Sequence, residues 1–244
     1  MDASLPLVAV AAFAGAAASG FAGFGFSAVA GAVLMHTLEP LIAVPLMMLC
    51  SVITQSVGIV HLRIAARPSA VLPLCAGGVA GLAIGIPILG ALDAGGFRAV
   101  FGAVLLCYGA AALRGPCARP KAWHGPSFAE RAGIGLLGGA IGALTALPST
   151  ALVIWADRRG LDKAELRGAV QPFVLTMQIC ALAGMGAAGM LDWVRLVPLV
   201  LAAMPPLAFG CALGLWLYGR VEQGLFRSAM LWTLIGAGAA LLAA

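Results

Sequence analysis

Six long apolar runs limit what this chain can fold into more than any other feature of its sequence. Each run approaches or exceeds the roughly 20 residues with which an α-helix crosses the hydrocarbon core of a bilayer. With 62% hydrophobic and 9% charged residues, a water-soluble fold would have too little polar surface to cover itself. We therefore expect an all-α polytopic membrane protein. Its predicted full spans are residues 40–60, 69–91, 97–113, 166–188, 193–217 and 226–244.

A pattern of small residues, closed by Phe-Arg, recurs in order and at identical spacing in the two halves of the chain. Its two copies are Gly81, Ala83, Gly85, Gly90, Gly95, Phe97 and Arg98, and Gly210, Ala212, Gly214, Gly219, Gly224, Phe226 and Arg227. Two related halves that rock about a site between them are the build of many secondary transporters. We expect a first repeat at residues 1–118, a basic cytoplasmic linker at 119–131 and a second repeat at 132–244.

Two further apolar segments, residues 5–35 and 132–156, are interrupted partway along by glycine or proline. The interruptions run from Gly20 to Gly25 in the first segment and from Gly138 to Pro148 in the second. The similar pairs Gly20-x-x-Gly23 and Gly139-x-x-Gly142 fall at matching places in the two halves. Matching interruptions of this kind indicate broken helices around a transport site. Close helix packing through small residues is the alternative.

The basic residues of the loops predict how the broken segments lie in the membrane. If both segments crossed, the fourteen Lys and Arg residues would divide evenly between the two sides. If each segment dips in and returns, only Arg98 and Arg195 lie outside and the rest inside, as the positive-inside rule requires. We therefore predict one re-entrant segment plus three spans in each half. The second half is then inverted, and both termini are extracytoplasmic. One tilted helix over residues 5–35 is the alternative.

Every Asp and Glu falls at a segment end or in a loop, which argues against a cation pump, because an intramembrane charge usually marks an ion path. A neutral polar path suits an anion better. Deep hydroxyls and amides, together with the N–H groups of broken helix ends, can hold an oxyanion without a buried cation. The candidate substrate-binding residues, near the point where the two breaks would face each other, are Gly23, Gly25, Ser27, Gln55, Thr145, Ser149, Thr150 and Gln178. Polar side chains that merely bridge helices are the alternative.

His36, at the end of the first broken segment, is the candidate for coupling transport to protons, because histidine changes charge near neutral pH. An ordinary interfacial histidine is the alternative. No two histidines pair at helical spacing and the six cysteines show no CxxC spacing, so we expect neither a metal nor another cofactor. The formal net charge of +5 is explained by short basic loops between spans, so no nucleic-acid partner is expected.

These motifs resemble those of the sulfite exporter TauE/SafE family of membrane transporters, also called the four-toluene sulfonate uptake permease family. The resemblance covers nearly all 244 residues and rests on the two glycine-rich segments and the duplicated pattern ending in Phe-Arg. It implies a secondary transporter of small anions, such as sulfite, organosulfonates or related organic acids, in the cell (inner) membrane. The chain departs from the commoner pattern where Phe24 and Phe26 flank Gly25. This bulkier break favours a larger organic acid or sulfonate over sulfite.

The leading prediction is therefore a secondary anion transporter that works by alternating access, and not an enzyme. A passive anion channel or a membrane scaffold shares the helices but needs no alternating access, and is the alternative. A membrane-embedded protease would need a serine with a base at depth, and Ser27 has no convincing base in the sequence. The expected partners are a small anionic substrate and the lipid bilayer. The glycine faces would also allow a homodimer.

Overall fold

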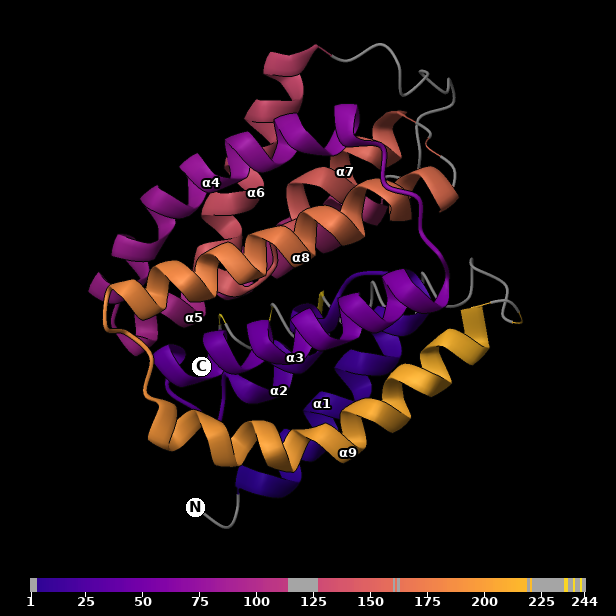
Figure 1. Cartoon of the computed structure of the whole chain (residues 1–244). Coiled ribbons are helices and arrows are strands. Elements are labelled where there is room, and N and C mark those ends of the chain that lie inside the picture. Colours follow the sequence, from indigo (N-terminus) through magenta and orange to yellow (C-terminus); the bar gives the residue numbers. More distant parts are fainter. Residues whose placement is uncertain are drawn as a thin grey trace.

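The computed structural model describes residues 4–113, 127–159 and 163–218, together with positions 161, 220, 235, 236, 239 and 242. This part of the chain contains nine α-helices and no strand (Figure 1). Most of the predicted span at 226–244 and of the predicted linker at 119–131 lies outside the described residues. The last four members of the second copy of the pattern also lie outside the described residues: Gly219, Gly224, Phe226 and Arg227.

The helices follow the predicted segments closely. The first half contains α1 (Ser4–Ala22), α2 (Phe26–Leu34), α3 (Pro40–His61), α4 (Pro68–Ala91) and α5 (Ala94–Leu113). The second half contains α6 (Phe128–Thr145), α7 (Ser149–Arg159), α8 (Lys163–Ala187) and α9 (Trp193–Tyr218). Helix α6 begins inside the predicted linker. The five predicted spans that the structure describes correspond to α3, α4, α5, α8 and α9.

Five of the described helices are long and apolar enough to cross a membrane: α1, α3, α4, α8 and α9. Helix α5 carries a shorter apolar stretch, Gly95–Ala111. Helix α1 was expected to be only part of a re-entrant segment, yet its apolar stretch from Leu5 to Ala22 is itself of spanning length. The all-helical, multi-pass membrane architecture predicted from the sequence is therefore confirmed at this level.

The first broken segment folds into a helical hairpin. Helix α1 ends at Ala22 and the chain turns through Gly23 and Gly25, whose φ angles of 85° and 92° lie in the left-handed region that glycine adopts without steric penalty. Helix α2 then packs back along α1. The two helices approach closely at Gly15, where an added Cβ would lie 2.9 Å from the carbonyl oxygen of Phe26. Residues 5–35 therefore do not form one tilted helix.

The second broken segment reverses at a different kind of residue. The turn lies between Thr145 and Ser149, and its left-handed position is Ala146, with a φ of 55°. Gly138 and Gly142, which the sequence placed in the break, stay inside α6. A Cβ on either glycine would lie within 2.7 Å of an atom of Pro148. These glycines make room for the returning chain instead of forming the turn.

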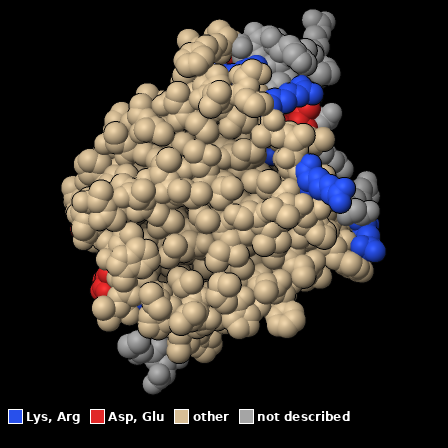
Figure 2. Space-filling view, viewed as in Figure 1, with Lys and Arg blue, Asp and Glu red and all other residues tan. Residues whose placement is uncertain are grey.

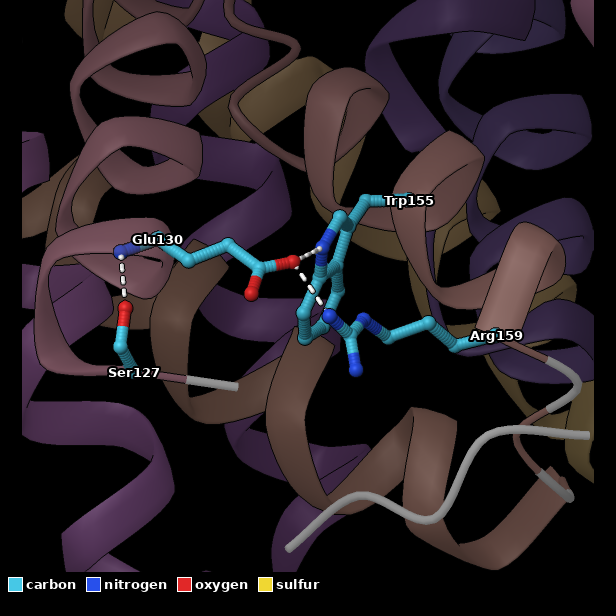
Figure 3. A network of polar contacts seen from close by, with 4 residues as sticks. All are labelled: Ser127, Glu130, Trp155 and Arg159. Atoms are coloured by element: carbon cyan, nitrogen blue, oxygen red, sulfur yellow. Dashed lines mark hydrogen bonds and ion pairs between the residues drawn. The ribbon is translucent and has the colours of Figure 1, made fainter. Parts of the chain in front are cut away.

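A polar network holds the open end of the second hairpin together (Figure 3). The Trp155 indole Nε1 donates a hydrogen bond of 2.9 Å to Glu130 Oε1, and the Arg159 guanidinium donates to the same oxygen. The Arg159 guanidinium also lies 4.9 Å from the Trp155 ring centroid. Ser127 accepts from the Glu130 N–H at 3.2 Å and so caps α6. Because Glu130 begins α6 and Arg159 ends α7, this network fixes the two helices side by side.

Two close helix pairs join the halves of the chain: α1 with α9, and α4 with α6. In both pairs a Cβ added to a glycine would lie within 2.7 Å of a backbone oxygen of the partner helix. These contacts join Gly81 to Leu136, Gly85 to Ala140, Gly210 to Phe13 and Gly214 to Ala17. Residue numbers rise together along each pair, so both pairs are parallel. The first two glycines of each copy of the pattern thus have the same structural role. Helices α3 and α8 pack against each other between the two pairs.

The two ends of the helical bundle differ in charge. One end, called the basic end below, gathers the loop after α3, the starts of α4, α6 and α8, and the ends of α7 and α9. Lys and Arg collect along one edge of the surface in Figure 2, and other residue types cover the bundle between the ends. The opposite end holds residues 35–40 and the starts of α5 and α9. Among the described basic residues, only Arg98 and Arg195 lie at the opposite end.

Candidate functional site

Buried polar side chains follow the central helices α3 and α8. Every hydroxyl and amide side chain predicted for the site is 5% exposed or less: Ser27, Gln55, Thr145, Ser149, Thr150 and Gln178. Ser51 and Thr54 on α3 and Arg167 and Gln171 on α8 are also buried. Polar groups are thus concentrated where the two halves of the chain meet.

Several of these buried groups have no hydrogen-bond partner among the residues that the structure describes. They are Ser27 Oγ, Gln55 Oε1, Gln171 Oε1, Gln178 Oε1 and Arg167 Nη1. Buried polar groups in proteins are nearly always hydrogen-bonded to protein or to ordered water. A set of open donors and acceptors between packed helices is what a polar path through the bundle requires.

Arg167 lies directly against the first helix break. Its Nη2 donates to the carbonyl oxygen of Gly20 at 3.0 Å and also to that of Phe21. Both carbonyls belong to the last turn of α1, where a helix leaves its carbonyls unpaired and carries a partial negative charge. The guanidinium also stacks on the Tyr218 ring at 4.0 Å. A buried cation is therefore held by backbone carbonyls and an aromatic face.

The same break has no room for a side chain. A Cβ on Gly23 would lie 3.0 Å from Arg167 Cγ and 3.0 Å from its Nε. The next helix, α2, begins at Phe26 without a side-chain cap at its N-terminus. The free N–H groups of that first turn carry a partial positive charge. Glycine at position 23 therefore lets the guanidinium lie against the turn between α1 and α2.

A cavity of about 500 Å³ leads from the surface of the basic end to this guanidinium. Arg67, 56% exposed, and the buried Arg167 both line it, together with Tyr218 and Glu165. Glu165 lies 3.7 Å from the Arg67 guanidinium. The closest carboxylate in the cavity wall is thus beside another arginine, and the positive charge of Arg167 remains available to an anion.

At the second break, a different residue of α8 binds the backbone of the turn. Gln178 Nε2 donates to the carbonyl oxygen of Ala146 at 3.3 Å. The hydroxyls of Thr145 and Thr150 donate to the backbone of their own helix or turn, at Ile141 and Leu147. Within this group, the Oε1 atom of Gln178 accepts no hydrogen bond from the described residues.

The structure does not bring the two breaks to the same depth. Gly23 lies against Arg167 and Ala146 against Gln178, eleven residues further along α8. At about 1.5 Å per residue, the two contacts are about 16 Å apart along that helix. Gln171 lies between them, and its amide nitrogen packs against Gly58 of α3. The two breaks therefore contact α8 at different positions along its length.

At the first break the structure places a buried cation that sequence analysis did not predict there. Arg167 is only 4% exposed, although sequence analysis assigned its charge to a cytoplasmic loop. The signal that would have found it is the spacing of Arg167, Gln171 and Gln178. Steps of four and seven residues place all three on one face of a helix. His36 lines a smaller cavity at the opposite end of the bundle from Arg167.

Comparison with known proteins adds one finding to this geometry. A family model described as sulfite exporter TauE/SafE matches residues 7–241, which is almost the whole chain. No curated protein and no solved structure matches the chain.

Proposed function

The chain belongs to the sulfite exporter TauE/SafE family, a family of membrane transporters and not of enzymes, and we propose that it moves small anions by alternating access between its two halves. The proposed substrates are sulfite, organosulfonates or related organic acids, and the proposed location is the cell inner membrane. The observation that carries the proposal is that the buried Arg167 lines the cavity of about 500 Å³.

The chemistry of Arg167 suits an oxyanion. A guanidinium is planar and presents its N–H donors as a fork that matches the oxygens of sulfite, sulfonate or carboxylate. Nη2 is used by the α1 carbonyls, and Nη1 has no partner among the described residues. A charge is costly to bury unless an opposite charge compensates it. An incoming anion in the cavity that Arg167 lines would supply that charge.

The polar groups deeper in the bundle are the proposed continuation of the path. Gln171 and Gln178 follow Arg167 on one face of α8, and Gln55 lies on the facing helix α3. Within the described part of the chain, the unpaired atoms of these amides are the Oε1 acceptors. An amide that rotates by 180° presents its N–H groups instead, and these donate to an oxyanion without adding charge. We assign the residues around the breaks, Gly23, Gly25, Ser27, Thr145, Ser149 and Thr150, to the walls of this path.

Crossed packing of the halves supports an inverted repeat. Helix α1 of the first half packs against α9 of the second, and α6 of the second against α4 of the first. The α1–α2 hairpin has its turn at the basic end, beside Arg167. The α6–α7 hairpin has its open end at the basic end, where Arg159 binds Glu130. The hairpins thus enter the bundle from opposite ends, as inverted halves with re-entrant segments would.

Counterflow of labelled sulfite in proteoliposomes tests the proposal. A charge-assisted hydrogen bond contributes about 1.5–3 kcal/mol, so Arg167→Gln should lower the rate at low substrate about tenfold or more. Arg167→Lys should recover part of it, because the charge remains but the fork is lost. Arg220→Gln is the matched control, since Arg220 is an exposed arginine that does not line this cavity.

Size-exclusion profiles and melting temperatures of the variants separate lost transport from lost folding. Normal saturable counterflow by folded Arg167→Gln would refute the role of Arg167. Sulfite flux without saturation or counterflow in the unmodified protein would favour a passive channel over alternating access. Absence of flux for sulfite, sulfonates and carboxylates alike would refute the proposed substrate class.

A further inference from the structure

We propose that the cavity at the opposite end of the bundle is a second binding site for a small oxyanion, with Arg98 as its cation. This cavity has a volume of about 220 Å³ and is lined by the loop between α2 and α3 and by the start of α5. His36, Glu39 and Arg98 are its charged or titratable residues. The site goes beyond the proposed transport path, because it lies at the other end of the molecule from Arg167.

The carboxylates at this end are already engaged by other groups. Glu39 Oε2 accepts from Arg195 Nη1 at 2.9 Å. Asp93 Oδ1 accepts from the Gly96 N–H at 2.9 Å and caps α5. Asp192 Oδ1 accepts from the N–H of Arg195 at 3.1 Å and caps α9. Among the described residues, Arg98 has no carboxylate in hydrogen-bond contact, although Arg98 lines the cavity.

The walls of the cavity fit a small oxyanion with Arg98 at one side. Phe97 is fully buried and closes part of the wall with an apolar ring. His36 adds an imidazole, whose N–H can donate to an anion in either tautomer. Thr37 Oγ1 donates to the Leu34 carbonyl at 3.3 Å, so its hydroxyl is anchored to the end of α2. The guanidinium and the imidazole are therefore the donors that face an incoming anion.

The charge of Glu39 affects the affinity of the site for an anion. Its carboxylate lies in the cavity wall but is neutralised by Arg195, which belongs to α9. If that ion pair opened, a negative charge would face the bound anion and repel it. The affinity of the site therefore depends on whether α9 and the start of α3 remain paired across the two halves of the chain.

Equilibrium dialysis with radiolabelled sulfite, under anaerobic conditions, tests the proposal on the whole protein in nanodiscs of phosphatidylcholine. The unmodified protein should show two classes of site. Arg98→Gln should remove one class and Arg167→Gln the other, so each proposal can fail without obscuring the other. Arg98→Lys should keep its class at reduced affinity. Arg220→Gln is the control, because Arg220 is an exposed arginine outside both cavities.

Two further arms decide the source of the anion and the role of Glu39. Because the Arg195–Glu39 pair is exposed, Arg195→Gln should weaken the Arg98 site about two- to fivefold by freeing the Glu39 carboxylate, and the added change Glu39→Gln should restore it. Unchanged sulfite binding by folded Arg98→Gln would overturn the proposal. Loss of the Arg98 site in nanodiscs that contain phosphatidylglycerol would assign Arg98 to lipid phosphate and also overturn it.

Discussion

Gly23 is the residue on which the geometry at the first break depends. Its φ of 85° costs a side-chain-bearing residue about 1–2 kcal/mol. A Cβ there would also press on Arg167 at 3.0 Å. We expect Gly23→Ala to lower the melting temperature and, in addition, to raise the KM for sulfite severalfold by displacing the guanidinium. Thermal unfolding and counterflow kinetics measure the two effects separately.

Gly189 provides the matched control for that variant. Its φ of 69° is also left-handed, but a Cβ there would meet no atom within 4 Å. Gly189→Ala should therefore lose a comparable amount of stability while its KM stays unchanged. An equal rise of KM in both variants would mean that backbone strain, and not contact with Arg167, limits transport.

For individual residues, the sequence predicted which polar side chains are buried better than it predicted which residues they contact. Ser27, Gln55 and Gln178 were expected at depth, and all three are buried. The burial of Arg167 was missed because an arginine near the start of an apolar run is usually assigned to the adjacent basic loop. Its capture by the Gly20 carbonyl joins residues 147 positions apart. A pairing over that sequence separation depends on how the helices pack, which residue spacing alone does not specify.

Among the elements, the α6–α7 hairpin is held at its open end by the Glu130 network shown in Figure 3. Glu130→Gln keeps the side-chain shape but removes the charge that Arg159 binds. Because Glu130 is 38% exposed, we expect a loss of only about 1 kcal/mol. Hydrogen exchange of the α7 amides should then be roughly five times faster. Glu165→Gln, which alters the Arg67 pair instead, should leave α7 exchange unchanged. Equal exchange in the Glu130 variant and the unmodified protein would contradict this role for the network.

Helix ends were predictable and helix breaks only in part. Bilayer thickness sets the length of an apolar run, so the predicted spans agree with α3, α4, α8 and α9. A glycine, by contrast, serves either a turn or a close approach of helices, and the sequence does not distinguish them. Gly23 and Gly25 form a turn, whereas Gly138 and Gly142 only make room for Pro148. The turn itself contains Ala146, a residue with no sequence signal for left-handed backbone.

For the whole molecule, the distribution of charge and the direction of the helices point to one orientation. Helix α1 runs parallel to α9, and α9 ends at the basic end, where Tyr218 stacks on Arg167. Ser4, at the start of α1, therefore points toward the opposite end. The loop at residues 35–40 lies at that end as well. From the positive-inside rule we therefore propose that the basic end is cytoplasmic and that the start of α1 shares the extracytoplasmic side with this loop.

Cysteine labelling in intact cells tests this orientation and the hairpin together. Ser4→Cys and Thr37→Cys should both react with a membrane-impermeant maleimide, because the α1–α2 hairpin returns to the side from which it entered. Arg67→Cys should react only after the membrane is permeabilised. The unmodified protein, whose described cysteines are mostly buried or partly buried, supplies the background signal. If Ser4→Cys and Thr37→Cys reacted from opposite sides, residues 5–35 would cross the bilayer. The inverted arrangement of the halves would then be refuted.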